Sequence, residues 1–406
     1  MTKGTFKREK TKLILLGLQH TFTMFASTIL VPKMLGLNIS VAIFMAGVET
    51  LIFHAFTKGK VPVFLGSSFE YMPPLIIAAS LYGMEYALGG VVLCGLAYLL
   101  VSILVYFLGA DKITNVFPPV ITGSISIALG LSLASHAIGL ASSNWLLAVI
   151  TLLIIVIINV YCKGFTKLLS IIISLILVYL LSIILTTVNI ATLVDFSQVN
   201  KAAWFGIPQF TVAKFNVETF MLVLPYAICA IVDHIGDVIV VGAVCDKNFV
   251  KEPGIHRTLI GDGVAMSFSA LLGGPPNATY SENIGVLALT QNFNPKTIRI
   301  AALFAIVLGF VPKLSALISV IPDGIIGGIS IMLFGTISSM GVNQFVDNKV
   351  DFKNAKNIII VTLILILSIG GASVNFSIGN VKVVVEGLGL AAIVGVVLNL
   401  ILPNKQ

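Results

Sequence analysis

Acidic side chains inside apolar stretches are the residues of this sequence best suited to chemistry. Asp233 and Asp237 are four residues apart, so they share one face of a helix while His234 points elsewhere. Glu282 follows a stretch rich in Gly and Pro. An ionisable residue inside a membrane span costs about 2.5 to 3.5 kcal/mol on insertion scales, and such residues are functional by default. We therefore expect function from Asp233, Asp237 and Glu282, with a structural hydrogen bond to another span as the alternative.

Two more acidic residues have a less distinctive setting. Glu49 lies late in the apolar stretch 39–56, and Glu70 follows Phe69 in a stretch with several prolines. Either carboxylate can be functional or can lie near the end of a span, and both interpretations stay open. Phe69 can stack on a flat ring or belong to the core.

Supporting residues are expected beside these groups. His20 and His234 occupy matching places in the two halves of the chain, where each could donate a hydrogen bond to a carboxylate or to irregular backbone. Tyr280 and Asn283, which flank Glu282, are assigned the same supporting role. Paired spacing typical of metal or redox sites is absent from the four cysteines, so we expect no metal site and no cofactor. They are Cys94, Cys162, Cys229 and Cys245.

The elements that position these residues must be membrane spans. Of the 406 residues, 57% are apolar and only 10% are charged, against about 25% charged in an ordinary soluble domain. The mean hydropathy of +1.06 describes the whole chain rather than one anchor. The net charge of +7 falls in short loops between spans, so we expect no nucleic-acid binding. Catalytic motifs such as Gly-x-Ser-x-Gly and His-Glu-x-x-His are missing, and we expect no enzyme.

Fourteen stretches are apolar enough, or short and interrupted enough, to be spans of an all-α polytopic membrane protein. They are 13–31, 39–56, 64–79, 86–108, 116–140, 145–161, 168–186, 219–242, 258–273, 277–290, 298–318, 325–342, 357–372 and 386–402. With the N-terminus inside, 19 of the 24 Lys and Arg residues lie on the cytoplasmic side, so both termini are expected there.

The two halves resemble each other at an offset of 204 residues. Pro118 to Ile127 matches Pro322 to Ile331, and an odd number of spans per half requires an inverted repeat. Chance matching of small residues is the alternative. The third segment of each half, 62–74 and 273–285, contains prolines and glycines that prevent a continuous helix. Irregular backbone at membrane depth is tolerated where it faces a cavity or other protein, so these segments are expected to line the substrate site.

The sequence resembles the nucleobase-ascorbate transporter family, also called nucleobase:cation symporters, and within it the uracil permeases. The most specific match is Asn277 to Thr290, and supporting matches are Gln19-His20, Lys58 to Phe69 and Asp246 to Arg257. The resemblance implies seven-plus-seven inverted repeats with short strands in spans 3 and 10. It also implies import of uracil with a proton across the cell membrane by alternating access, often by homodimers.

Domains and site residues follow from the same resemblance. It implies that Phe69 stacks on the pyrimidine, that Asp233 and Glu282 accept its N–H groups, and that backbone around Phe69 and Ser281 contacts its carbonyls. Proton coupling is assigned to Asp237, Asp233 and Glu282. The implied division is a core domain (1–110 and 218–322), a gate domain (111–190 and 323–406) and an extracellular loop (191–217).

Three residues depart from the family pattern and leave the substrate open. The family usually has glutamate at Asp233, glycine at Ser281 and histidine at Asp237, while Glu49 and Glu70 are extra carboxylates. A carrier of xanthine or another purine is the first alternative, and an anion transporter of the same architecture is the second.

Overall fold

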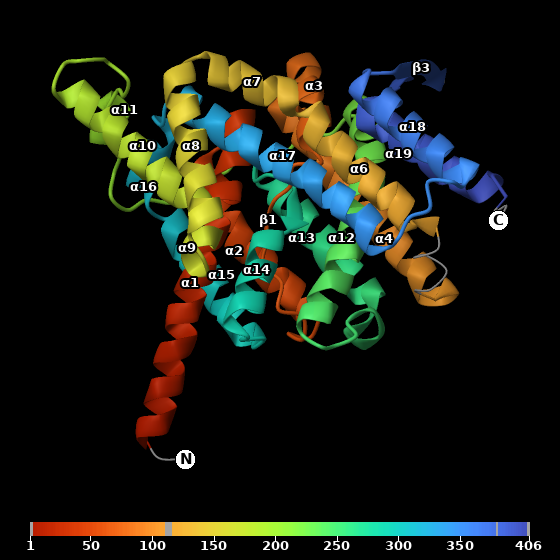
Figure 1. Cartoon of the computed structure of the whole chain (residues 1–406), viewed down its shortest axis with the longest axis horizontal. Helices are drawn as coiled ribbons and strands as arrows, with labels where there is room; N and C mark the ends of the chain where they lie inside the picture. The colour runs from red at the N-terminus through yellow and green to blue at the C-terminus, as the bar shows by residue number, and fades with distance from the viewer. Residues whose placement is uncertain (1–2, 110–115, 379–380, 404–406) are drawn as a thin grey trace.

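The computed structural model describes residues 3–109, 116–378 and 381–403 (Figure 1). For residues 3–10, 281, 378, 381 and 382 it describes the backbone alone. The elements of the first half are α1 (Lys3–Leu35), α2 (Ile39–Phe56), β1 (Leu65–Ser67), α3 (Met72–Tyr82), α4 (Met84–Leu108), α6 (Pro119–Ser132), α7 (Ala134–Ser142), α8 (Trp145–Tyr161), α9 (Phe165–Leu168), α10 (Ser170–Thr187) and α11 (Ser197–Lys201). Those of the second half are α12 (Val217–Val244), η1 (Val250–Gly254), α13 (Ile255–Leu271), β2 (Asn277–Thr279), α14 (Ser281–Thr290), α15 (Pro295–Gly309), α16 (Pro312–Ser319), α17 (Asp323–Asp347), α18 (Ala355–Ile369), β3 (Ser373–Ile378), β4 (Val381–Glu386) and α19 (Gly387–Ile401).

Most of the described chain is helical, and much of it is apolar enough for a bilayer. In the described part of the chain, seven helices have the length and hydropathy to cross a membrane, with α6 and α7 counted as one. The pair α15 and α16, bent by 81°, makes an eighth if it is one span. Among the described residues, α3, α8, α18 and α19 are shorter apolar helices. The prediction of a mostly helical chain with many membrane spans is therefore confirmed. The expected domain boundary between residues 110 and 111 lies outside the described residues.

The two broken segments meet at the centre of the molecule. β1 and β2 pair antiparallel, with Leu65 opposite Thr279 and Ser67 opposite Asn277. The pairing continues where the Ser68 backbone N–H donates to the Pro276 carbonyl at 2.8 Å. These strands satisfy each other's backbone groups where the prolines and glycines forbid a helix. Helices α3 and α14 then begin close behind the strands, so their N-termini lie beside this crossing.

Strands also occur outside the two broken segments, the only places where we expect them from the sequence. β3 and β4 form an antiparallel hairpin, with Ser373 opposite Glu386, just before α19. The segment alternates and is rich in β-branched residues, a composition that fits a pleated strand better than a helix. The hairpin is short and lies between the last two predicted spans, so the pattern of apolar spans does not indicate it.

The matched Pro-Gly segments of the two halves occupy equivalent positions. Pro118 and Pro322 cap the starts of α6 and α17, and these two helices pack against each other. Their approach is close: a Cβ atom on Gly341 would lie 2.4 Å from the Gly123 carbonyl oxygen. α17 also packs on α7 and α8, while α13 packs on α4 and α2, and α15 on α2 and α1.

Candidate binding site

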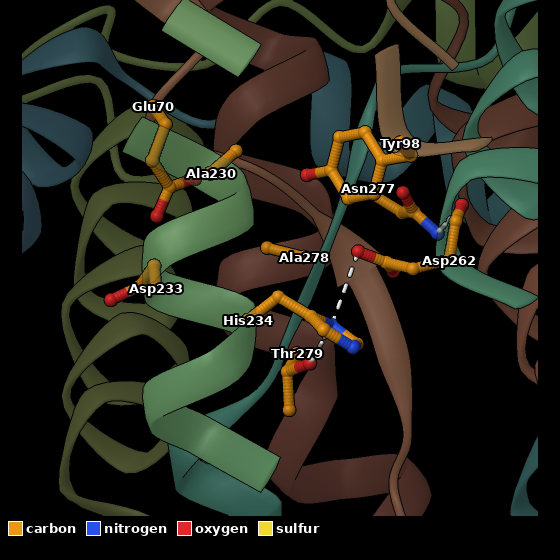
Figure 2. Close-up of a pocket in the computed structure, with 9 residues that line it drawn as sticks. All are labelled: Glu70, Tyr98, Ala230, Asp233, His234, Asp262, Asn277, Ala278 and Thr279. Atoms are coloured by element: carbon orange, nitrogen blue, oxygen red, sulfur yellow. Dashed lines mark hydrogen bonds and ion pairs between the residues drawn. The ribbon is translucent and has the colours of Figure 1, made fainter. Parts of the chain in front are cut away.

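A small polar cavity lies beside the crossing of the broken segments (Figure 2). It measures about 10 Å³, room for about one water molecule. Its lining comes from the turn after β1, from α4, α12 and α13, and from β2. The lining residues are Glu70, Tyr98, Ala230, Asp233, His234, Asp262, Asn277, Ala278 and Thr279. No lysine or arginine of the described chain is among them, so the site favours ligands that donate hydrogen bonds.

One side of the cavity carries two carboxylates. Glu70 reaches down from the turn between β1 and α3, and Asp233 projects from α12 on the same side of that helix (Figure 2). The carboxylates of Glu70 and Asp233 are close enough to interact electrostatically. The Ser68 hydroxyl donates a hydrogen bond to Oε2 of Glu70. Glu70 is therefore a buried residue of the site rather than a residue at a span end.

The opposite side carries a buried histidine–aspartate pair. His234 projects from the other side of α12, as its spacing from Asp233 predicts, and its Nδ1 lies 3.2 Å from Oδ2 of Asp262 (Figure 2). The Thr279 hydroxyl is 3.4 Å from the same nitrogen. The supporting role expected for His234 thus has a geometric basis. Asp262 was missed, although an acidic residue in the predicted span 258–273 meets the criterion that identified Asp233.

Several polar atoms of the lining have no protein partner. Asp262 Oδ1, Asn277 Oδ1 and His234 Nε2 are all buried and form no hydrogen bond within the described structure. Asn277 uses its amide nitrogen on the Asp262 carbonyl oxygen at 3.5 Å. Buried polar atoms are normally satisfied by protein or by ordered water. The cavity is thus chemically suited to water or to a small polar ligand group.

Glu282 lies outside this cavity. Its Oε1 accepts a hydrogen bond of 2.6 Å from the Ser27 hydroxyl of α1. The carboxylate is in electrostatic range of Asp237, which is itself in range of Asp233 and Glu70. The structure therefore gathers four of the acidic residues singled out from the sequence around one part of α12, with Glu282 on its α1 side.

Phe69 packs against α17. Its ring meets Phe334 of α17 edge to face, with centroids 5.7 Å apart and planes at 78°. Phe334 also lines an apolar cavity of about 340 Å³ between α6, α7 and α17. A flat ligand that stacked on Phe69 would therefore lie between the broken segments and α17.

The remaining supporting residues differ in their contacts. The Tyr280 hydroxyl donates to the Ser67 carbonyl and accepts from the Thr28 hydroxyl, both at 3.3 Å, so it ties α1 to β1. The amide of Asn283 is buried without a partner in the described structure. The expected hydrogen bond from His20 is not found among the described residues, where both of its buried ring nitrogens lack a partner. Ser281 begins α14, and its side chain lies outside the described atoms.

Glu49 is buried too. It lies on α2 in electrostatic range of Asp262 and in contact with Ser269 of α13. Its Oε1 has no hydrogen-bond partner in the described structure. Among the described residues, no group of three or more His, Cys, Asp or Glu side chains could hold a metal ion.

Apolar helices of spanning length, joined by two broken segments with buried carboxylates at their crossing, define a multi-pass membrane transport protein. The family model described as "Permease family" matches residues 11–376. The chain belongs to this family, whose members are permeases and not enzymes, and the resemblance inferred from the motifs is confirmed.

Related sequences cover nearly the whole chain. The uracil permease of Bacillus subtilis (strain 168) is 39% identical over 409 residues, which cover 96% of this chain and 92% of the relative. The uracil permease of Escherichia coli (strain K12) is 35% identical over 397 residues, covering 95% and 90%. A putative pyrimidine permease of the same bacterium, RutG, is 36% identical and covers 96% and 89%.

Solved structures share the fold at low identity. The transmembrane domain of the cyanobacterial bicarbonate transporter BicA aligns with a TM-score of 0.65 at 13% identity and covers 96% of both chains. The structure of SLC26A9 aligns with a TM-score of 0.72 at 10% identity, covering 96% of this chain and 64% of the other.

Proposed function

We propose that this protein imports uracil together with a proton. The observation that carries the proposal is the cavity at the strand crossing, which is lined by carboxylates and by no lysine or arginine of the described chain. Uracil is a flat ring with two N–H donors and two carbonyl acceptors, so it needs carboxylates, backbone amides and an aromatic face. Relatives named uracil permease, at 35% to 40% identity over nearly the full length, support the same substrate.

Individual roles follow from the positions of the groups. Asp233 and Glu282 accept hydrogen bonds from the ring N–H groups, and Phe69 stacks on the ring. Backbone N–H groups at the start of α14, around Ser281, donate to the ring carbonyls. The cavity holds about one water, so the groups must separate to admit a pyrimidine. Separation of Phe69 from Phe334 would open that space.

Alternating access is proposed as the movement between two groups of helices. The core domain comprises 1–110 and 218–322, and the gate domain comprises 111–190 and 323–406. The seven helices of spanning length, the bent pair α15 and α16, the two strand–helix segments and the helices α8, α13, α18 and α19 make fourteen spans in two inverted repeats of seven. Proton coupling is assigned to Asp237, Asp233 and Glu282. Asp237, one turn from Asp233, exchanges the coupled proton between solvent and the site, and a neutral carboxyl crosses a poorly solvated site at lower cost than a charged one.

The membrane arrangement completes the proposal. Both termini face the cytoplasm, residues 191–217 face outward, and the protein works in the cell membrane, where a homodimer is the expected assembly. The positive-inside distribution of Lys and Arg supports this orientation.

A second candidate function, anion transport, is favoured by the fold shared with a bicarbonate transporter. The carboxylate lining opposes it, because an anion in this cavity would be repelled. Binding to the purified protein separates the candidates. Uracil should displace radiolabelled uracil, whereas xanthine should do so weakly and bicarbonate or sulfate should not. Stronger displacement by xanthine would favour a purine carrier, and displacement by the anions would favour an anion transporter.

A further inference from the structure

Glu70 is a carboxylate that the proposed function leaves without a role. It lines the cavity together with Asp233, and Figure 2 shows the two side chains on the same side of α12. It is 7% exposed. It directly follows Phe69, the residue placed against the substrate ring. A group in this position must contact either the substrate or the residue that binds it.

The surroundings of Glu70 disfavour two negative charges. No lysine or arginine of the described chain lines the cavity, and Ser68 supplies one hydroxyl donor to Oε2 of Glu70. Two adjacent carboxylates without a cation are stabilised when they hold one proton between them. The other ionisable groups within electrostatic range of this pair are one acid, two phenols and a thiol: Asp237, Tyr71, Tyr98 and Cys229. Asp262 lines the same cavity. His234, also on the cavity, is engaged by Asp262.

The opposite side of the cavity indicates a ligand independently. Asp262 and Asn277, at 2% and 1% exposure, each present a side-chain oxygen without a partner in the described structure. The Tyr98 hydroxyl points between this side and the Glu70 side (Figure 2). A polar group that enters from the Glu70 side therefore meets further hydrogen-bonding atoms across the cavity.

We propose that Glu70 and Asp233 act as a hydrogen-bonding pair that holds one proton and recognises an adjacent N–H and C=O of the substrate. Neutral Glu70 donates its O–H to a ring carbonyl, while ionised Asp233 accepts the neighbouring ring N–H. No covalent bond to the substrate forms. One proton enters from solvent with the substrate, resides on the Glu70 carboxyl, and leaves with it. This inference rests on the proposed function, and it assigns Glu70 a role in both specificity and proton uptake.

Linkage gives the proposal a measurable signature. If one proton enters with each substrate, the affinity of the wild-type protein for uracil falls about tenfold per pH unit, once the pH is high enough for the Glu70–Asp233 pair to lose its shared proton. Glu70→Gln keeps a donor in the same place but no titrating group. Its affinity for uracil should therefore no longer fall as the pH rises. Glu70→Ala has neither donor nor acceptor, and its affinity should fall at least tenfold at acid pH.

The experiment is calorimetric titration of the purified proteins with uracil, across pH and in buffers of different ionisation enthalpy. Asp195→Asn, in the loop before α11, is the matched control and should keep the wild-type slope and about one proton taken up per uracil. A Glu70→Gln protein with the wild-type slope and proton count would overturn the proposal. If Asp237→Asn alone flattens the slope, the proton belongs to Asp237 and the proposal is likewise overturned.

Two further results keep the outcomes separate. If Glu70→Gln does not give a folded protein, Ser68→Ala removes the hydroxyl that holds Glu70 and should shift the pH at which affinity falls. An unchanged midpoint in folded Ser68→Ala would overturn the proposal. A wild-type protein that binds no uracil, or binds it without proton uptake, would count against the proposed function itself. Proton uptake that Glu70→Gln leaves unchanged would overturn only the pairing of Glu70 with Asp233.

Discussion

His234 Nδ1 lies 3.2 Å from Oδ2 of Asp262, and both side chains are almost completely buried. The contact joins α12 to α13 on the side of α12 that faces away from Asp233 (Figure 2). It fixes the rotation of α12, and with it the direction in which Asp233 and Asp237 project. The pair therefore links the stability of the helix packing to the geometry of the binding site.

Removal of the Asp262 carboxylate should destabilise the protein. Asp262→Ala leaves His234 Nδ1 with only the long contact to Thr279, and an unsatisfied buried polar group costs about 1 to 3 kcal/mol. Asp262→Asn keeps an acceptor and should lose less. The measurement is the free energy of unfolding in detergent micelles, and equal stability of Asp262→Ala and wild type would contradict the structural role.

Glu282→Ala should abolish uracil binding. The variant leaves a ring N–H without its acceptor in a poorly hydrated site, at a cost of about 1 to 3 kcal/mol, or more because the lost bond is charge-assisted. Ser27→Ala is the control, since it removes the hydroxyl bound to Glu282 but retains the carboxylate. Equilibrium binding of radiolabelled uracil tests this, and near-wild-type affinity in folded Glu282→Ala would place the site elsewhere.

Phe69→Ala should weaken uracil binding without unfolding the protein. Loss of ring stacking costs about 0.5 to 1.5 kcal/mol beyond the lost contact area. The same substitution also removes the edge-to-face contact with Phe334. Phe334→Leu therefore serves as the control: it breaks that contact but leaves the ring of Phe69 free to stack. An affinity for uracil that is unchanged in Phe69→Ala would exclude stacking.

Asp237→Asn should separate exchange from accumulation. The amide mimics a protonated carboxyl that cannot release its proton, so substrate exchange persists while proton-driven concentration is lost. Asp233→Asn should damage binding as well. The comparison is uracil counterflow against gradient-driven uptake in proteoliposomes. Accumulation by Asp237→Asn would transfer proton coupling to another carboxyl of the site.

The proposed topology predicts labelling from opposite sides of the membrane. In a variant without Cys94, Cys162, Cys229 and Cys245, single cysteines replace Lys201 or Lys353. Lys201 lies in α11, and Lys353 lies between α17 and α18. An impermeant thiol reagent should label the first from outside and the second from inside. Labelling of both from one side would contradict the orientation.

Local patterns in the sequence predicted the parts of the fold that depend on local chemistry. The stretch 39–56 is α2, the prolines and glycines around Gly66 and Gly274 mark the broken segments, and four-residue spacing aligns Asp233 with Asp237. Contacts between distant segments could not be found in this way.

The bond between Ser27 and Glu282 joins residues 255 positions apart, and neither neighbourhood indicates the other. Glu70 and Glu49 looked alike in sequence, yet only Glu70 lines the cavity beside Asp233. The contact between Asp262 and His234 could not be predicted from the sequence, because the two residues come from different spans. The side chains that meet in the site are set by packing, which no single segment encodes.

Proton-driven accumulation of uracil is the most direct test of the proposed transport. The purified protein, reconstituted in liposomes, should concentrate radiolabelled uracil when a proton gradient is directed inward, and excess unlabelled uracil should block the signal more effectively than xanthine. Collapse of the gradient with a protonophore should reduce uptake to equilibration. Equal uracil uptake with and without the gradient would contradict proton coupling, and the absence of any uracil uptake by folded protein would contradict the proposed function.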